Sequence, residues 1–178
     1  MEEERTRLFQ LDLEPSVYVG LALFTDVKNA ADLRKKVADG NLTGALLEPK
    51  MIVETFQVLV AANKTVQALN RKCMKTRGIH TEIIYNLSPT RSITDSLKKF
   101  AIGDESTSVL LAVVDEASGT MLRDACRHVD GHLAHLDDLV DLADSARIRS
   151  VYKIGDNELR IGSLLDAVVM RMATKDNR

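Results

Sequence analysis

The run VYVGLALF at residues 17–24 is almost wholly apolar and rich in β-branched and aromatic side chains. A short run of this kind predicts a strand that is covered on both faces, in the middle of a sheet. Just before it, residues 8–13 alternate, so that Phe9 and Leu11 face one way and Gln10 and Asp12 the other. This pattern predicts a half-buried strand. Because residues 14–16 make only a short link, we expect the two strands to form a hairpin.

Downstream of this hairpin, apolar spacing predicts helices. One covers residues 27–38, with Asp26 as its N-cap, and another covers 79–87, which ends at Ser88-Pro89. A third follows Ser92, whose spacing from Asp95 resembles a capping box. The longest predicted helix spans residues 51–74 and has a single apolar stripe. The stripe consists of Ile52, Phe56, Leu59, Ala62, Val66, Leu69 and Cys73.

The second half of the chain repeats this mixture. Buried strands are expected at 109–114 and 151–154, and helices at 121–129 and 136–143. Asn157 is expected to cap a last helix whose stripe is Ile161, Leu165, Val168 and Met172. The predicted fold is α+β, a single domain over residues 1–178 with several helices packed on a small mixed sheet. Residues 1–6 form an acidic leader that we expect to be flexible.

Composition excludes several classes of protein. The 178 residues carry 24 Lys and Arg against 26 Asp and Glu, a formal net charge of −2, so any binding of polyanions requires a local patch. No apolar run approaches the ~18 residues that span a bilayer. Cys73 and Cys126 have no CxxC spacing, and the acidic start resembles neither a signal nor a transit peptide. These features predict reduced thiols in the cytosol or nucleus.

Basic residues concentrate between positions 57 and 81, which hold no Asp or Glu. They are Lys64, Arg71, Lys72, Lys75 and Arg77. Two interpretations remain open. Cations at the end of a helix relieve its exposed carbonyls, so the cluster is explained by a solvated helix end. Alternatively, uncompensated cations bind phosphates, with Asn63, Thr65 and Thr76 as neutral hydrogen-bonding neighbours.

Other motifs give weaker signals. His128, His132 and His135 are spaced as a zinc face on an unbroken helix would be, but Gly131 interrupts the segment, so scattered surface histidines are the better interpretation. The sequence contains no GxxxxGK[ST], GxGxxG or GxSxG motif. It therefore predicts a binding protein without a cofactor or metal, and not an enzyme.

The last helix has apolar residues beyond its stripe, at Leu164, Val169 and Met170. They suit either a helix buried in its own core or a surface that docks a partner.

Several strings resemble the smallest-subunit family of the KEOPS (EKC) complex. They are DVKNA at 26–30, VLVAANK at 58–64, MKTR at 74–77, TEIIYNLSP at 81–89, SLKKF at 96–100 and LLDAV at 164–168. The resemblance covers about residues 8–176. It implies a non-catalytic subunit of the machinery that makes threonylcarbamoyl-adenosine in tRNA, present in cytoplasm and nucleus. Such a subunit binds the small PRPK-type atypical kinase, supports its ATPase activity and reaches the other KEOPS/EKC subunits through it.

The same resemblance implies two surfaces. Archaeal relatives hold the single-stranded CCA end of tRNA, and the matching region is the basic cluster. It assigns phosphates to Lys64, Lys75 and Arg77, with Asn63, Thr76 and Asn86 as neighbours. The kinase-facing surface is expected on the last helix, at Leu164, Val168, Arg171 and Met172. The alternative is a pure protein–protein regulator of the kinase that has no direct contact with tRNA.

Overall fold

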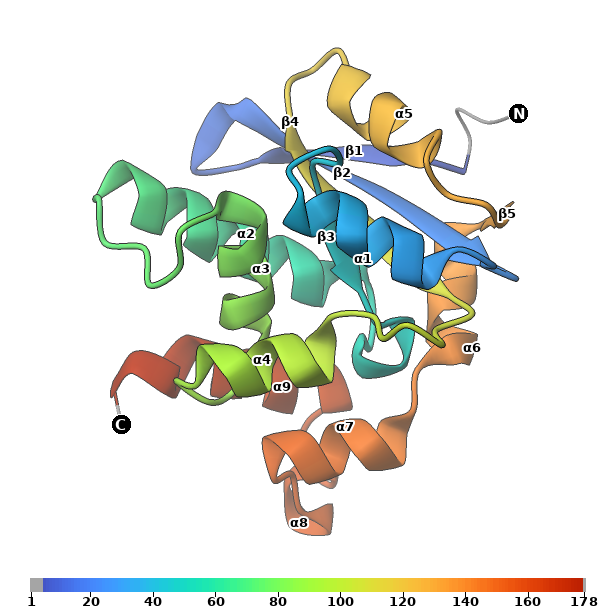
Figure 1. The fold of residues 1–178 in the computed structure, drawn as a ribbon. Coiled ribbons are helices and arrows are strands. Elements are labelled where there is room, and N and C mark those ends of the chain that lie inside the picture. Colours follow the sequence, from blue (N-terminus) through green and yellow to red (C-terminus); the bar gives the residue numbers. More distant parts are fainter. Residues whose placement is uncertain (1–4, 178) are drawn as a thin grey trace.

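A computed structural model describes residues 5–177, and its centre is one β-sheet (Figure 1). Within this range the strand order is β1-β2-β4-β3, and β5 pairs with β2 beyond that path. The strands are β1 (Arg7–Leu11), β2 (Glu14–Thr25), β3 (Ala45–Leu47), β4 (Val109–Asp115) and β5 (His132–Ala134). All these pairings are antiparallel. The predicted α+β class is confirmed, although the sheet is antiparallel and not mixed.

Strand β2 lies inside the sheet, as the run VYVGLALF predicts. It is paired with β1 on one side and β4 on the other. Alternate residues enter two separate clusters, so that Leu21 and Leu23 belong to one core, while Ala22 and Phe24 belong to the other. Both faces of the strand are therefore covered, and the predicted hairpin with β1 is confirmed.

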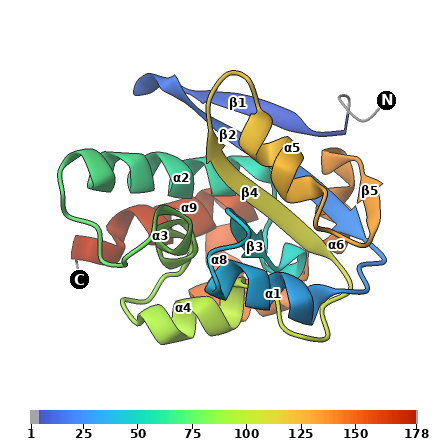
Figure 2. The same ribbon diagram turned by 45° about the horizontal axis from the view of Figure 1, so that its top comes forward.

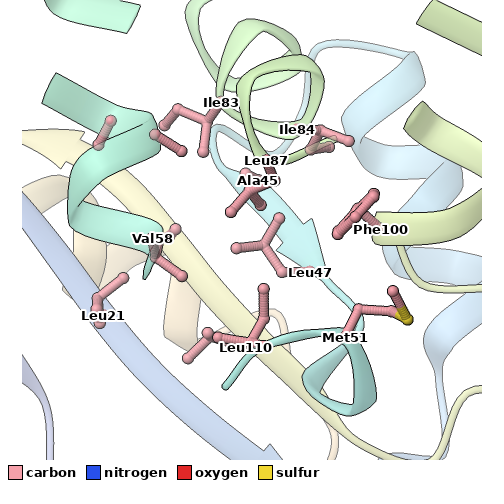
Figure 3. Packing of buried hydrophobic residues seen from close by; sticks show 14 of the residues in the cluster. Leu21, Ala45, Leu47, Met51, Val58, Ile83, Ile84, Leu87, Phe100 and Leu110 are labelled. Carbon is pink, nitrogen blue, oxygen red and sulfur yellow. The ribbon is translucent and has the colours of Figure 1, made fainter. Parts of the chain in front are cut away.

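Helices cover both faces of the sheet. Helices α1 (Ala30–Ala38) and α5 (Thr120–Cys126) lie in front of it in Figure 2, and α2 (Thr55–Asn70) and α9 (Leu164–Thr174) lie behind. The larger core is on the side of α2, where Val58, Ile83 and Phe100 pack toward Leu47 and Leu110 (Figure 3). The other helices are α3 (Ile79–Leu87), α4 (Ile93–Phe100), α6 (Leu139–Leu142), α7 (Ser145–Tyr152) and α8 (Asp156–Leu159). Three 3₁₀ turns complete the described elements: η1 (Pro49–Met51), η2 (Leu136–Asp138) and η3 (Lys175–Asn177).

The helix predicted for residues 51–74 is shorter than expected. Its buried side is formed by Val58, Ala61, Ala62 and Val66, whereas Phe56 and Leu69 are 52% and 44% exposed. The chain enters through η1, and it leaves through Lys72, which has a φ of 54°. Because neither feature disturbs the apolar spacing, the predicted helix ran past both ends of α2 and included the exposed Cys73. Within α2 the predicted stripe was also wrong at Phe56 and Leu69, which face solvent.

Helix α1 also begins later than predicted. Asp26 has a φ of 52°, and Asn29 is the residue that precedes the helix. The side chain of Asn29 leaves the helix uncapped and instead donates to the carbonyl of His128, 2.8 Å away. Helix α3 covers residues 79–87 as predicted, and Ser92 caps α4 by accepting from the backbone N–H of Asp95.

The strand predicted at residues 151–154 is wrong. These residues include the end of α7, where Ile148 and Tyr152 lie one turn apart and are both buried. A short segment with three apolar or aromatic residues, here Val151, Tyr152 and Ile154, fits a buried helix end as well as a strand. Ser163, and not Asn157, caps α9 through a reciprocal pair of bonds with Asp166. The helix predicted at 136–143 divides into η2 and α6.

Residues 1–4 of the predicted leader lie outside the described residues, while Arg5 donates to the carbonyl of Leu133 at 2.8 Å. The three-residue strands β3 and β5 were missed, because such short strands carry no periodicity. Between residues 5 and 177, no helix combines the length and the apolar character that crossing a membrane requires.

Candidate functional site

The end of α2 turns the chain back with a Schellman motif. Lys72 takes the left-handed conformation, its N–H donates to the carbonyl of Leu69 at 3.0 Å, and the N–H of Cys73 donates to that of Ala68 at 2.9 Å. These two bonds satisfy carbonyls that a helix end otherwise leaves open. Residues 71–78 then form a short connection to α3.

A buried carboxylate holds this connection in shape. Glu82, in the first turn of α3, is only 2% exposed. It accepts from the backbone N–H of Lys75 at 3.0 Å and of Thr76 at 2.7 Å, and from the hydroxyl of Thr76 at 2.7 Å. Because the acceptors of a buried carboxylate must be matched by donors, Glu82 fixes where the backbone of residues 75 and 76 lies.

A pocket of about 480 Å³ opens between α2, this connection, α3 and the end of the chain that follows α9. Its lining residues are Lys64, Gln67, Ala68, Arg71, Cys73, Lys75, Glu82, Tyr85, Asn86, Arg91 and Asp176. Four of these side chains are basic and two are acidic. In both ribbon views, the end of α9 lies on the same side of the molecule as the connection between α2 and α3 (Figure 1, Figure 2). We refer to this site as the basic pocket.

Three of the predicted tRNA-facing residues line the basic pocket: Lys64, Lys75 and Asn86. The side chain of Lys75 is exposed, whereas Lys64 forms an ion pair with Asp176 at 2.8 Å and donates to the carbonyl of Met172 at 3.2 Å. Asn86 is 3% exposed and donates to the hydroxyl of Thr65 at 2.9 Å. The pocket therefore offers one open lysine and one that is already paired.

The other three predicted residues are outside the lining of the basic pocket. Arg77 is exposed on the same connection, and the hydroxyl of Thr76 is used by Glu82 and by the carbonyl of Gly78. Asn63 is half-buried, and its Oδ1 is a buried atom that has no hydrogen-bond partner among the described residues.

The chain after α9 supplies residues that sequence analysis missed. Lys175 is 2% exposed, lies 3.4 Å from the centre of the Tyr85 ring and donates to the Tyr85 carbonyl. Burial lowers the pKa of Lys175 to about 8, and the neighbouring Lys64 cation contributes to this shift. Arg91 donates to the carbonyls of Lys175 at 3.3 Å and Asp176 at 3.1 Å. The hydrogen bond from Lys64 lowers the pKa of Asp176, which is therefore ionised at neutral pH.

Gln67, a lining residue that the sequence analysis did not assign, had a local signal. It lies three positions after Lys64 and four before Arg71, a spacing that places all three on the same side of the helix and its cap. Arg91, Tyr85 and Asp176 come from other parts of the chain, so only tertiary structure brings them to the same pocket.

The last helix presents a different face from the one predicted. Val168 and Met172 are 0% and 1% exposed and lie in the larger core, so their side chains are not available to a partner. Arg171 donates to Glu158 at 2.7 Å, and Leu164 packs against the core. The apolar residues that this region turns outward are Ile161 and Met170, which are 92% and 59% exposed, with half-buried Leu165 and Val169 beside them.

The three histidines singled out in the sequence lie on separate elements. His128 follows α5, His132 is in β5 and His135 precedes η2. They do not share a helix face, because Gly131 and β5 interrupt the segment. The described part of the chain contains no group of three or more His, Cys, Asp or Glu side chains that could hold a metal ion.

Comparison with known proteins identifies the family of this chain. The family model described as "Kinase binding protein CGI-121" matches residues 24–176, a range that includes α2, α3 and α9. The chain belongs to the CGI-121 family. The match covers the whole basic pocket and the outward face of α9.

Relatives in the CGI-121 family come from animals and fungi. "EKC/KEOPS complex subunit TPRKB" of Danio rerio is 43% identical over 167 residues, which is 93% of this chain and 95% of that protein. "EKC/KEOPS complex subunit cgi121" of Aspergillus fumigatus is 29% identical over 177 residues, 91% of this chain and 94% of that protein. "EKC/KEOPS complex subunit CGI121" of Kluyveromyces lactis is 31% identical over 130 residues, 72% and 82% of the two chains. The resemblance inferred from the sequence strings is confirmed.

Proposed function

We infer that this chain is a non-catalytic subunit of a KEOPS/EKC complex, in cytoplasm and nucleus. It binds a PRPK-type kinase directly, supports the ATPase activity of that kinase and holds the single-stranded CCA end of a tRNA. Membership of a kinase-binding family and relatives named as KEOPS/EKC subunits support the first part. The observation that carries the tRNA part is the basic pocket, in which Lys64, Arg71, Lys75 and Arg91 converge.

The chemistry of the basic pocket suits the end of a single strand of RNA. Its cations attract phosphates, and its volume of about 480 Å³ lies in the range of small-ligand sites. Gln67, which is half-buried, adds an amide group that can bond to sugars or base edges. The formal net charge of −2 makes general attraction to RNA weak, so binding requires a local group of cations such as this one.

Charge reversal at Lys75 tests the tRNA part. The Lys75 side chain is exposed and only its backbone N–H bonds to Glu82, so Lys75→Glu leaves the fold intact. We expect weaker binding of tRNA and a salt dependence whose slope falls by about one unit. Lys35→Glu, an exposed lysine on α1 across the sheet, is the matched control and should bind as the wild type does. Equal affinities for all three proteins would contradict the assignment of the pocket.

A protein–protein regulator without tRNA contact is the second candidate. One observation favours it: the Lys64 cation is already paired with Asp176 at 2.8 Å. Removing the CCA end of the tRNA separates the two candidates. Unchanged binding after trimming would support the regulator, and loss of binding would support the pocket.

The kinase part requires a separate measurement. We expect the chain and its species' PRPK-type kinase to co-elute in size-exclusion chromatography, with increased ATP hydrolysis. Met170→Asp should disrupt the complex, because Met170 is 59% exposed on α9. Val140→Asp is a matched control on α6 with 60% exposure, and should not. Separate peaks for the wild-type proteins would overturn this part of the proposal.

A further inference from the structure

An ion pair inside the basic pocket joins Lys64 on α2 to Asp176 in η3, the last described turn of the chain. Lys64 Nζ lies 2.8 Å from a carboxylate oxygen of Asp176. A carboxylate and a phosphate offer the same kind of charged acceptor to an ammonium group. Lys64 also donates to the carbonyl of Met172, so two of its three N–H groups are used.

The backbone around Asp176 is held by two more cations. Arg91 donates to the carbonyls of Lys175 and Asp176, and buried Lys175 lies against Tyr85. Two of the four basic side chains that line the pocket, Lys64 and Arg91, therefore bind residues 175 and 176 of the same chain. Arg71 and Lys75 lie on the rim and are exposed.

We propose that Asp176 is an internal anion that occupies the place of a ligand phosphate on Lys64, so that RNA must displace it to enter the basic pocket. This inference rests on the proposed binding of RNA in that pocket. Asp176 then weakens the binding of every ligand that needs Lys64. A phosphate can replace the Asp176 carboxylate as the anionic partner of Lys64, and a neutral molecule cannot. The contact would therefore select for phosphorylated ligands as well as limit affinity.

The ion pair between Lys64 and Asp176 is weak enough for a ligand to displace. The Lys64 side chain is 29% exposed and that of Asp176 is 47% exposed, so water screens their attraction. Exposed ion pairs of this kind contribute little to stability. An RNA end that brings more than one phosphate to four cations can compete with a single screened carboxylate.

The test is the affinity of a labelled RNA oligonucleotide ending in CCA, measured by fluorescence anisotropy. We expect Asp176→Asn to bind about three- to tenfold more tightly than the wild type. Asp32→Asn is the matched control, because Asp32 is 51% exposed and pairs with Lys36 at 2.9 Å on α1. It should leave the affinity unchanged. Circular dichroism should confirm that each variant is folded.

A double-mutant cycle separates displacement from simple charge repulsion. If Asp176 acts by occupying Lys64, the gain from Asp176→Asn should fall below about twofold in a Lys64→Met background. A gain that is as large or larger in that background would overturn the proposal.

The outcomes also separate this proposal from the function on which it rests. Weaker binding by Lys75→Glu with no gain from Asp176→Asn would mean that the pocket binds RNA and that the internal anion is wrong. No binding by any of these proteins, Asp176→Asn included, would overturn both. Weaker binding by Lys75→Glu together with tighter binding by Asp176→Asn would support both.

Discussion

At the scale of single residues, the shape of the basic pocket depends on Glu82. Glu82 is 2% exposed, and its carboxylate accepts hydrogen bonds from three donor groups of Lys75 and Thr76. These bonds position the backbone from which the exposed Lys75 side chain extends. An acidic residue thus prepares a basic site, because it binds the connection and not the ligand.

Replacing Glu82 with Gln tests this role. The amide NH₂ group would face backbone N–H donors and leave some of them without an acceptor, which we expect to lower the free energy of unfolding by about 1–3 kcal/mol. Urea denaturation gives that value directly. Glu116→Gln, which changes an exposed carboxylate after β4, is the control and should lie within about 0.5 kcal/mol of the wild type. Similar stabilities for the two variants would show that Glu82 has no such role.

At the scale of elements, α2, α3 and β2 show what sequence patterns can and cannot predict. Helix α3 was predicted to the residue, because Gly78 and Ser88-Pro89 mark both of its ends. Strand β2 was predicted from its continuous apolar run. The end of α2 was missed, because a lysine takes the left-handed position that glycine usually holds. Sequence patterns depend on composition and spacing, so they do not predict a helix that ends at a lysine in the left-handed conformation.

The site was predicted to a similar extent. Lys64, Lys75 and Asn86 belong to one stretch of sequence, and charge and resemblance were sufficient to find them. Asp176 reaches the pocket through the packing of α9 against α2, and Arg91 follows α3, which also packs against α2. The face of α9 was misjudged because both edges of the helix are apolar, so spacing alone could not indicate which one the core covers.

The left-handed backbone of Lys72 at the end of α2 can be tested by substitution. A non-glycine residue with a φ of 54° is strained, so Lys72→Gly should raise the free energy of unfolding by about 1 kcal/mol. Lys72→Ala removes the same charge and keeps the strain, and should not stabilise the protein. Thermal or urea unfolding of the two variants makes the comparison. Equal effects would attribute any change to charge and not to conformation.

Helix α3 is also joined to the sheet by a neutral histidine. His80 Nε2 accepts from the backbone N–H of Val114 at 3.1 Å, and burial lowers the pKa of His80 from 6.5 to about 4. The unfolded chain therefore binds a proton at His80 more tightly than the folded chain does. The stabilisation that neutral His80 gives to the fold is complete above pH 6.5 and is lost as the pH falls toward 4. The loss amounts to about 3 kcal/mol.

His80→Gln keeps an acceptor and removes the titration. We expect its free energy of unfolding to fall less than that of the wild type between pH 6.5 and pH 4. The exposed His132 serves as the control, and His132→Gln should follow the wild-type curve. Parallel curves for the wild type and His80→Gln would show that His80 is not held neutral.

At the scale of the whole molecule, the two proposed surfaces share one helix: the kinase surface follows its exposed side from Ile161 to Met170, and the basic pocket lies beyond its last turn. Helix α9 has 11 residues and is therefore about 16 Å long. Ile161, which is 92% exposed, precedes its first turn, and Asp176 follows its last turn in the basic pocket. The same helix packs on α2, which supplies Lys64. We therefore propose that a kinase and an RNA end are bound at the same time.

The most direct test of the account is a size-exclusion experiment that mixes the chain, its PRPK-type kinase and a labelled tRNA. The account predicts one peak that contains all three, and a Lys75→Glu peak that keeps the kinase and loses the tRNA. A kinase that displaces the tRNA, or a Lys75→Glu variant that retains it, would contradict the claim that one chain holds both partners on separate surfaces.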